Sequence, residues 1–596
     1  MKVEMKWKNR IRSNGIKGCL IGIIALFFIQ TIAYAEPISK KILPSGSTVE
    51  QIGPQISQFV ADHSSDTGVA VSVFYKNKTI VQDYYGYADR STKSYVNKDS
   101  VMEWGSISKG LVWISVMQLW EQGRLQLNKD IRTYLPKGFL KNLHFKKKIT
   151  MLHLMNHTGG FQDLIIDTFI RDPQNLQSLY KTLKSHQPEQ VLLPGVATGY
   201  SDWGCALAAY IVQRISKINI VEYEHIHILN PLGMKHTAVA SDLSDNPWVN
   251  KQRDRIKGYS SIQTELPRYY FTLFPAGSVT STLRDLERFA KAILNHNRLL
   301  LKESTWKKMQ SPSNYLGDSR IPVNYHGLWA QPYGQHVMGH QGNTMDFTAT
   351  MILDVKNKIG CVVLVNESYD TTYTEQMPIL LYGAFSSKAY FHVKREMPSG
   401  FFRMAKSIRY GPLKISSLFE IVAGVEDSEL WMNGKIGHLD KICFPYGDFI
   451  EISMVTFILE CILLLVWIFA FLFSFVSLAV RLTTIPIKLI LRKPVRIQLG
   501  KWSSISAVVQ MMSLGLLGLL VYRILQGSIS TDYIWISKGF FVVLSMLLIL
   551  IVIGIKKIVQ TKSGHKRKIY NIIVLLSLIF AVINILYWNT FMFRRI

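Results

Sequence analysis

Cysteine is scarce in this chain, which has five cysteines among its 596 residues. Cys19 and Cys461 lie in apolar segments, and Cys205, Cys361 and Cys443 lack the close spacing of metal ligands. This distribution excludes a small scaffold built on disulfides. The chain also lacks a Gly-rich phosphate-binding loop and any recognisable cofactor motif. We therefore expect neither a metal nor a cofactor.

Acidic residues are few relative to basic ones, 41 against 68, and the net charge is +27. Many of the basic residues gather near the N-terminus and in two short segments near the C-terminus. Such clustering is typical of membrane topology and not of a nucleic-acid-binding surface. We expect a lipid bilayer, and no nucleic acid, among the partners.

Residues 1–35 have the pattern of a secretory signal peptide. Six basic residues precede the apolar run Cys19–Thr31, and Ala33-Tyr34-Ala35 supplies small residues where a signal peptidase needs them. Cleavage there would leave Glu36 as the first residue, and an uncleaved anchor is the alternative. Either way, the domain that follows, residues 36–390, is expected outside the cytoplasmic membrane.

Long apolar runs are confined to the last third of the chain. A membrane-spanning helix needs about 20 such residues. The third run is short and must borrow residues 534–537, with Lys538 snorkelling or packed among the helices. We predict a four-helix transmembrane region over residues 451–596, with the apolar runs Cys461–Val480, Ser504–Tyr522, Gly539–Ile555 and Ile572–Met592.

The basic segments between these runs predict the orientation of the helices. One lies between the first and second runs and the other between the third and fourth. Both are expected on the cytoplasmic side, which places the preceding domain outside. Arg594 and Arg595 at the outer end run against this rule.

Residues 391–450 form a juxtamembrane segment in which aromatic and aliphatic residues mix with basic ones. Phe401, Phe402 and Met404 alternate with Arg403 and Lys406, for example. The pattern fits an interfacial helix lying on the lipid surface. It fits a small subdomain that covers the membrane junction equally well.

The domain before this segment has strands at both of its ends. Gly68–Tyr75 and Thr79–Tyr87 alternate in hydrophobicity and predict a β-hairpin, and Phe347–Leu353 with Ile359–Val365 predict a second one. Helical patterns lie between the two hairpins. We predict an α/β (α+β) domain in which one antiparallel sheet is flanked by helices.

The tetrapeptide Ser106-Ile107-Ser108-Lys109 opens a long apolar helix. Residues three apart share a helix face, so the Lys109 amine can lie against the Ser106 hydroxyl. A serine is a weak nucleophile without a base beside it. Lysine can be that base if burial lowers its pKa. This pair is our candidate for nucleophilic catalysis.

Two further segments carry candidate site residues. In Tyr200-Ser201-Asp202, a phenol near a lysine cation could act as a general base, although Tyr200 could equally cap a helix. In Gly339–Asn343, the glycines would let the backbone approach a ligand and offer N–H groups to an oxyanion. An ordinary turn, with His340 a surface histidine, is the alternative.

Histidines elsewhere give little support for a metal site. His153 and His157 are four residues apart in Thr150–Gly160, but no acidic third ligand follows at zinc-like spacing. By itself this segment predicts a short helix that ends at a glycine. His225 and His227 likewise lack a defined third partner.

Taken in order, these segments resemble one superfamily: class C β-lactamases, penicillin-binding-protein-like enzymes and related serine esterases. The resemblance covers most of residues 36–388, and Ser-x-x-Lys is its most specific motif. The segments that carry it are Gly68–Tyr87, Glu103–Lys109, Thr150–Gly160, Pro194–Asp202, Pro275–Ser281 and Gly339–Gly342.

The resemblance implies a role for each site residue. Ser106 would form the acyl-enzyme, and Lys109 and Tyr200 would share general-base and general-acid work. The backbone N–H groups of Ser106 and Asn343 would form the oxyanion hole. His340, followed by Gly342, would stand where true β-lactamases carry the lysine of a Lys-Thr-Gly triad.

Two departures from the superfamily pattern concern the electrostatics of the site. Asp202 stands where asparagine is usual, and an ionised carboxylate accepts hydrogen bonds but cannot donate them. It could receive a substrate amine or amide, or pair with Lys109, keep it charged and push the base role toward Tyr200. His340 is mostly uncharged at neutral pH, so a fixed cation for a substrate carboxylate is missing. Both changes disfavour β-lactamase or DD-carboxypeptidase action.

These features predict a membrane-anchored, extracytoplasmic serine hydrolase that cleaves an amide or ester through an acyl-serine. The resemblance implies a substrate with D-amino-acid character, such as a cell-wall-related peptide or ester. A secreted domain followed by membrane helices also resembles peptidases that remove an N-acyl-D-asparagine cap from exported nonribosomal peptides. Those have three helices, where four are expected here. A penicillin-binding sensor or a non-catalytic scaffold is the alternative of another class.

Overall fold

The structure is a computed structural model. It describes residues 40–63, 66–162, 168–334, 336–384, 401–405, 432–436, 439–443, 447–492, 501–525, 530–560 and 564–587. The predicted signal peptide, residues 1–35, lies outside the described residues.

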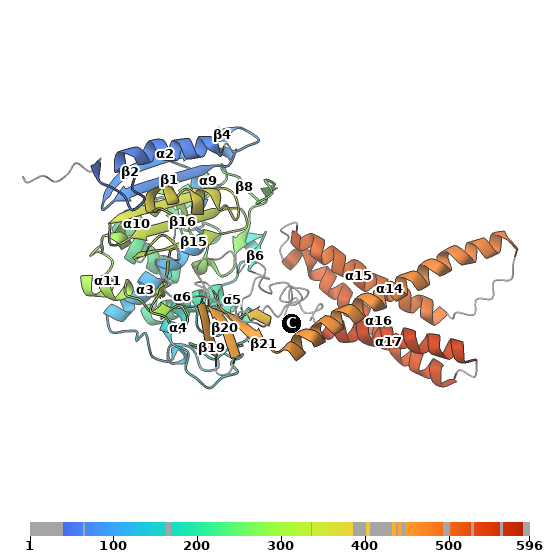
Figure 1. Ribbon diagram of the computed structural model, residues 1–596. Helices are drawn as coiled ribbons and strands as arrows, with labels where there is room; N and C mark the ends of the chain where they lie inside the picture. Colours follow the sequence, from blue (N-terminus) through green and yellow to red (C-terminus); the bar gives the residue numbers. More distant parts are fainter. Residues whose placement is uncertain are drawn as a thin grey trace, which may run out of the picture. The chain divides into compact units, whose positions relative to one another are not determined.

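One antiparallel sheet of eight strands is the frame of the hydrolase domain (Figure 1). Both predicted hairpins are confirmed as adjacent pairs of its strands. The central strands β16 and β17 are buried along their whole length, so both faces of the sheet are covered. In sheet order the strands are β12 (Asn314–Tyr315), β13 (Pro322–Tyr325), β14 (Leu328–Ala330), β15 (Val337–Asn343), β16 (Thr348–Asp354), β17 (Ile359–Val365), β1 (Val69–Tyr75) and β2 (Lys78–Tyr85).

Helices pack against this sheet and against one another. The helix α10 (Leu283–Leu294) is amphipathic and buries its apolar face against β1, β16 and β17. The helices α3 (Lys109–Glu121), α4 (Met151–Met155) and α6 (Asp202–Ser216) lie together on the side of β15 (Figure 1). The predicted fold class is confirmed. The remaining helices of this part are α5 (Leu179–Ser185), α7 (Ile220–Glu224), α8 (Asn230–Leu232), α9 (Pro247–Arg253) and α11 (Glu303–Met309).

Short strands complete the hydrolase part. β5 and β7 flank β11 in a three-stranded sheet, and the others form two-stranded pairs. They are β3 (Tyr87–Asp89), β4 (Ser94–Tyr95), β5 (Val101–Glu103), β6 (Phe169–Ile170), β7 (Thr237–Ala238), β8 (Gly258–Tyr259), β9 (Glu265–Leu266), β10 (Tyr270–Phe271) and β11 (Thr280–Thr282).

Residues 40–63 and 377–384 form a compact unit of their own. Within it, α2 (Val49–Asp62) contacts α12 (Ile379–Tyr382). The backbone N–H of Ser45 donates to the carbonyl of Leu381 at 3.1 Å. Thr48 and Gln51 form a capping box at the start of α2, which satisfies two of its first N–H groups.

The juxtamembrane segment contains a four-stranded sheet in the order β18-β21-β20-β19. Phe401–Met404 therefore form a strand and not part of an interfacial helix. Residues 406–431, where most of that helix was expected, lie outside the described residues. The strands are β18 (Phe401–Met404), β19 (Met432–Ile436), β20 (Leu439–Cys443) and β21 (Phe449–Ile452).

Four long helices follow, and they pack side by side as a bundle (Figure 1). All four are long and apolar enough to cross a membrane, over Met454–Thr484, Lys501–Leu519, Lys538–Gln560 and Lys568–Tyr587. This confirms the predicted number. The third helix does continue through Lys538, which is exposed. Their full extents are α14 (Met454–Ile490), α15 (Lys501–Leu525), α16 (Ser530–Gln560) and α17 (His565–Tyr587).

A buried ion triad joins three segments beside the catalytic helix. The Arg253 guanidinium lies 3.0 Å from Glu103 and 3.0 Å from Asp346. It also donates to the Ile256 carbonyl and lies over the Phe347 ring. Burial, with the negative charge of Glu103, raises the pKa of Asp346 to about 7. The two carboxylates therefore depend on one cation.

Replacing that cation is predicted to destabilise the fold. Arg253→Met would leave the buried Asp346 and the partly buried Glu103 without a counter-charge, at a cost of about 3–5 kcal/mol. We expect a Tm lower by about 10 °C in thermal unfolding of the detergent-solubilised protein. The exposed Arg255 is the matched control, and Arg255→Met should leave Tm unchanged. Equal Tm values for the two variants would contradict the assigned role.

Candidate active site

Ser106 lies in a 3-10 turn, Gly105–Ser108, that leads directly into α3. A 3-10 turn places residues i and i+3 on the same side, which brings Lys109 under Ser106. The Lys109 Nζ donates to Ser106 Oγ at 2.8 Å. Gly105 has a φ of +51°, and a Cβ there would lie 2.6 Å from the Asn343 nitrogen. The turn therefore requires glycine at this position.

The Lys109 ammonium is fully buried and is surrounded by three acceptors. Besides Ser106 Oγ, it donates to the Ala276 carbonyl at 2.8 Å and pairs with Asp202 at 2.6 Å. Burial alone lowers the pKa of Lys109, but the Asp202 carboxylate outweighs burial and holds the pKa above its ordinary value. The resting lysine is therefore charged, with two hydrogen-bond acceptors and the Asp202 carboxylate as its ion-pair partner.

Tyr200 lies beside this ammonium. The Lys109 Nζ is 4.8 Å from the centre of the Tyr200 ring. Burial raises the pKa of the Tyr200 phenol, and Lys109 offsets this effect only in part. Ser201 caps α6 by accepting from the Gly204 N–H, so Tyr200 lies just before the helix and Asp202 is its first residue.

His340 faces Tyr200 from the strand β15, with the ring centres 6.2 Å apart. Its Nδ1 lies 2.5 Å from the Gln341 carbonyl oxygen. A carbonyl can accept a hydrogen bond but cannot donate one, so Nδ1 carries the proton. Burial lowers the pKa of His340 to about 3, and the Lys109 charge adds to this effect. The ring is neutral, and its Nε2 is an acceptor.

The backbones of Ser106 and β15 approach closely, as an oxyanion hole requires. A Cβ on Gly342 would lie 1.9 Å from the Trp104 carbonyl oxygen and 2.9 Å from the Ser106 nitrogen. Only glycine fits there. The Asn343 side chain has local partners: its oxygen accepts hydrogen bonds from Thr348 Oγ1 and from the Tyr369 N–H.

The other histidines have structural partners. His153 completes a capping box with Thr150 at the start of α4, and His225 pairs with Asp245 at 2.7 Å. His157 stacks on Tyr200 with ring centres 4.4 Å apart, and its Nδ1 accepts from the Ser201 N–H at 3.0 Å. Sequence reasoning did not find this support for Tyr200. Within the described residues no group of three potential ligands could hold a metal ion.

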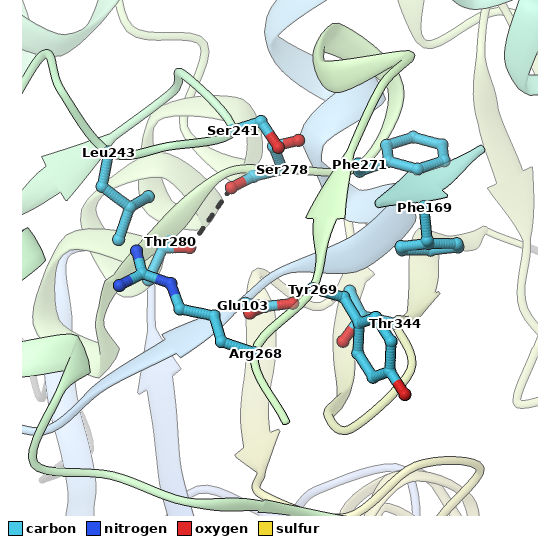
Figure 2. A pocket seen from close by; sticks show the side chains of 11 residues that line it. Glu103, Phe169, Ser241, Leu243, Arg268, Tyr269, Phe271, Ser278, Thr280 and Thr344 are labelled. Carbon is cyan, nitrogen blue, oxygen red and sulfur yellow. Dashed lines mark hydrogen bonds between the residues drawn. The ribbon is translucent and has the colours of Figure 1, made fainter. Parts of the chain in front are cut away.

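A pocket lies among segments that adjoin the site residues in the chain (Figure 2). Figure 2 shows Phe169 and Phe271 on one side and Leu243 and Arg268 on the other. The pocket is small, with a cavity volume of about 10 Å³, room for about one water molecule. Glu103, Gly277 and Thr344 also line it, and Gly277 and Thr344 each directly follow a site residue, Ala276 or Asn343.

Comparison with known proteins agrees with this geometry. The sequence profile of the beta-lactamase family matches residues 56–382, which is more than half of the chain. The chain belongs to the beta-lactamase family.

Its curated relatives are distant members. Protein flp of Staphylococcus aureus is 23% identical over 305 residues, which cover 50% of this chain and 59% of flp. A beta-lactamase of Yersinia enterocolitica is 25% identical over 338 residues, which cover 51% of this chain and 82% of the enzyme. The chain thus matches well under two thirds of the length of flp.

Two solved structures are similar to this chain. A penicillin-binding protein homologue from Pyrococcus abyssi matches with a TM-score of 0.47 and 20% identity, over 66% of this chain and 87% of that one. A beta-lactamase/D-alanine carboxypeptidase from Pseudomonas syringae matches with a TM-score of 0.45 and 20% identity, over 56% of this chain and 98% of that one.

The pair of Lys109 and Asp202 predicts a pH effect. Asp202→Asn removes the charge that raises the pKa of Lys109, so the neutral amine becomes available at lower pH. We expect the limb on which the acylation rate rises with pH to move down by about 1–3 pH units. Stopped-flow acylation by a p-nitrophenyl ester, followed across pH, measures the limb. A limb that stays in place would show that Lys109 is not the base.

Proposed function

We propose that this protein is a membrane-anchored, extracytoplasmic serine hydrolase that cleaves an amide or ester bond in a D-amino-acid-containing substrate. The observation that carries the proposal is the contact between Ser106 and Lys109 inside a beta-lactamase fold. Lys109 first has to lose one proton, and its neutral amine then accepts the Ser106 proton while Oγ attacks the substrate carbonyl. The leaving amine or alcohol takes up a proton, and water then releases the acyl group.

The charges of the site favour a substrate without a free carboxylate next to the scissile bond. The Lys109 cation is matched by Asp202, and His340 is neutral. The neutral His340 therefore cannot bind a substrate carboxylate through a charge–charge interaction. An ester, a blocked peptide or a substrate with an amine fits these residues better than a penicillin does.

The pocket of Figure 2 supports a short, polar side chain on the acyl residue. The hydroxyls of Ser241 and Ser278 are buried and make no hydrogen bond with the part of the chain that is described. Ser278 is only 7% exposed. A carboxamide both donates and accepts, so it could satisfy both hydroxyls. The pair of hydroxyls thus suits a small group that both donates and accepts, of which the asparagine carboxamide is one example.

The carboxamide links the site to a second candidate function, removal of an N-acyl-D-asparagine cap from an exported peptide. The helices α14 to α17 support a lipid-tailed substrate, because a single helix would suffice as an anchor. The expected signal peptide and the basic segments between the helices support an extracytoplasmic site. A β-lactam sensor or a scaffold would be acylated without turnover or not at all.

Turnover of matched substrates tests the proposed function. We expect the full-length protein in detergent to cleave N-acyl-D-aminoacyl amides and esters, D-asparaginyl ones fastest, and to leave the L-series intact. Ser106→Ala should abolish cleavage, because the acyl acceptor is lost, and a Ser115→Ala variant on the same helix is the control. Activity that survives Ser106→Ala would disprove the mechanism, and equal cleavage of both series would remove the D-preference.

Restoring a cation tests the role of the neutral histidine. His340→Lys should improve kcat/KM for substrates that carry a free carboxylate by about tenfold, because a charged hydrogen bond contributes about 1.5–3 kcal/mol. Activity on the matching amidated substrates should not improve. Competition assays with each carboxylate and amide pair measure the ratio. An unchanged ratio would mean that residue 340 does not contact this part of the substrate.

A further inference from the structure

The juxtamembrane sheet contacts the loop that carries Tyr200, although it lies beyond residues 56–382, which match the family. Gly447 forms an antiparallel bridge with Gly199. The Asp448 N–H donates to the Thr198 carbonyl at 2.9 Å, and the Thr198 N–H donates to Asp448 Oδ2 at 3.0 Å. Asp448 is 4% exposed and Thr198 is 5% exposed. A single buried residue thus holds both backbone groups of Thr198.

His157 holds the same loop from another direction. The Gly199 N–H donates to the His157 carbonyl at 2.8 Å, and the Ser201 N–H donates to its ring. The ring also stacks on Tyr200. Residues 198–201 are therefore fixed by two partners, one inside the family domain and one outside it.

We propose that Asp448 is a positioning residue of the hydrolase site. Through Thr198 it sets the path of the loop, and therefore the position of Tyr200 two residues later and of Asp202 at the start of α6. A carboxylate that accepts a buried N–H makes a stronger bond than a neutral acceptor does. A shift of about 1 Å in a catalytic group can cost about 100-fold in rate, so the loop has to be held.

Asp448 is itself well supported by the sheet. The Ala405 N–H donates to the Asp448 carbonyl at 2.7 Å. Cys443 of β20 is buried in one cluster with Leu316, which follows β12, and Val323 of β13 in the main sheet. Arg403 of β18 pairs with Glu460 of α14 at 2.6 Å, which joins the same sheet to the first long helix. The juxtamembrane sheet that holds the Tyr200 loop thus contacts both the main sheet and the helix α14.

Three substitutions in the full-length protein test the proposal. Asp448→Ala should lower the rate of Ser106 acylation about 10- to 100-fold, mainly in kcat, because the loop loses its acceptor. Asp448→Asn keeps an oxygen in the same place and should stay within about threefold of wild type. Asp448→Glu moves the carboxylate and should lose about tenfold. The pH at which the acylation rate rises should change in the Ala and Glu variants and not in the Asn variant.

Asp354 provides the matched control. It is also 4% exposed, and its carboxylate accepts a backbone N–H, that of Asn357, in the turn after β16. Asp354→Ala should lower Tm without changing the acylation rate per folded molecule or its pH limb. Equal rate losses in Asp354→Ala and Asp448→Ala would overturn the proposal. If Asp448→Ala does not fold, wild-type rates in both Asp448→Asn and Asp448→Glu would overturn it.

Amide hydrogen exchange gives a readout that is independent of activity. The N–H of Thr198 should exchange at least about tenfold faster in Asp448→Glu than in wild type, with peptides elsewhere in the hydrolase domain unchanged. Unaltered exchange at residues 196–201 would overturn the positioning role. If no probe acylates the wild-type protein but the Thr198 N–H still exchanges faster in Asp448→Glu, the result counts against the proposed function alone.

Discussion

The buried ammonium of Lys109 is the charge on which the geometry of the site depends. An ion out of contact with water is costly unless its hydrogen-bonding groups are matched. Here the three acceptors come from separate segments: Ser106 from the turn before α3, Ala276 from a later turn, and Asp202 from the start of α6. The charge is satisfied only when all three segments meet. Folding and assembly of the site are therefore one event.

This arrangement also decides what the site offers a substrate. The positive charge of Lys109 is matched inside the protein, and the histidine on the facing strand is kept neutral by burial. The site has hydrogen-bonding groups in several directions but little net charge. Recognition then depends on shape and on paired donors and acceptors, which discriminate well when both sides are buried.

Much of this could be predicted from the sequence. The two hairpins, the four apolar helices and the contact of Ser106 with Lys109 follow from short-range patterns, since alternation, run length and i to i+3 spacing are local. The pairing of Asp202 with Lys109 was one of two alternatives, and the structure places the two side chains in contact. The stacking of His157 on Tyr200 and the triad around Arg253 join residues far apart in the chain, and no local pattern carries that information. A buried Arg253 in a short helix of mostly polar residues looks like any surface arginine in the sequence.

The bridge between Gly199 and Gly447 has a consequence for exchanging parts among relatives. Similarity to the family ends at residue 382, but the physical unit that holds the catalytic loop continues into the sheet after it. A chimera joined at the end of the similarity would combine one protein's loop with another protein's support. Such a hybrid could retain every motif residue and still carry a misplaced tyrosine. The workable junction lies after β21, where the sheet is complete and the first long helix begins.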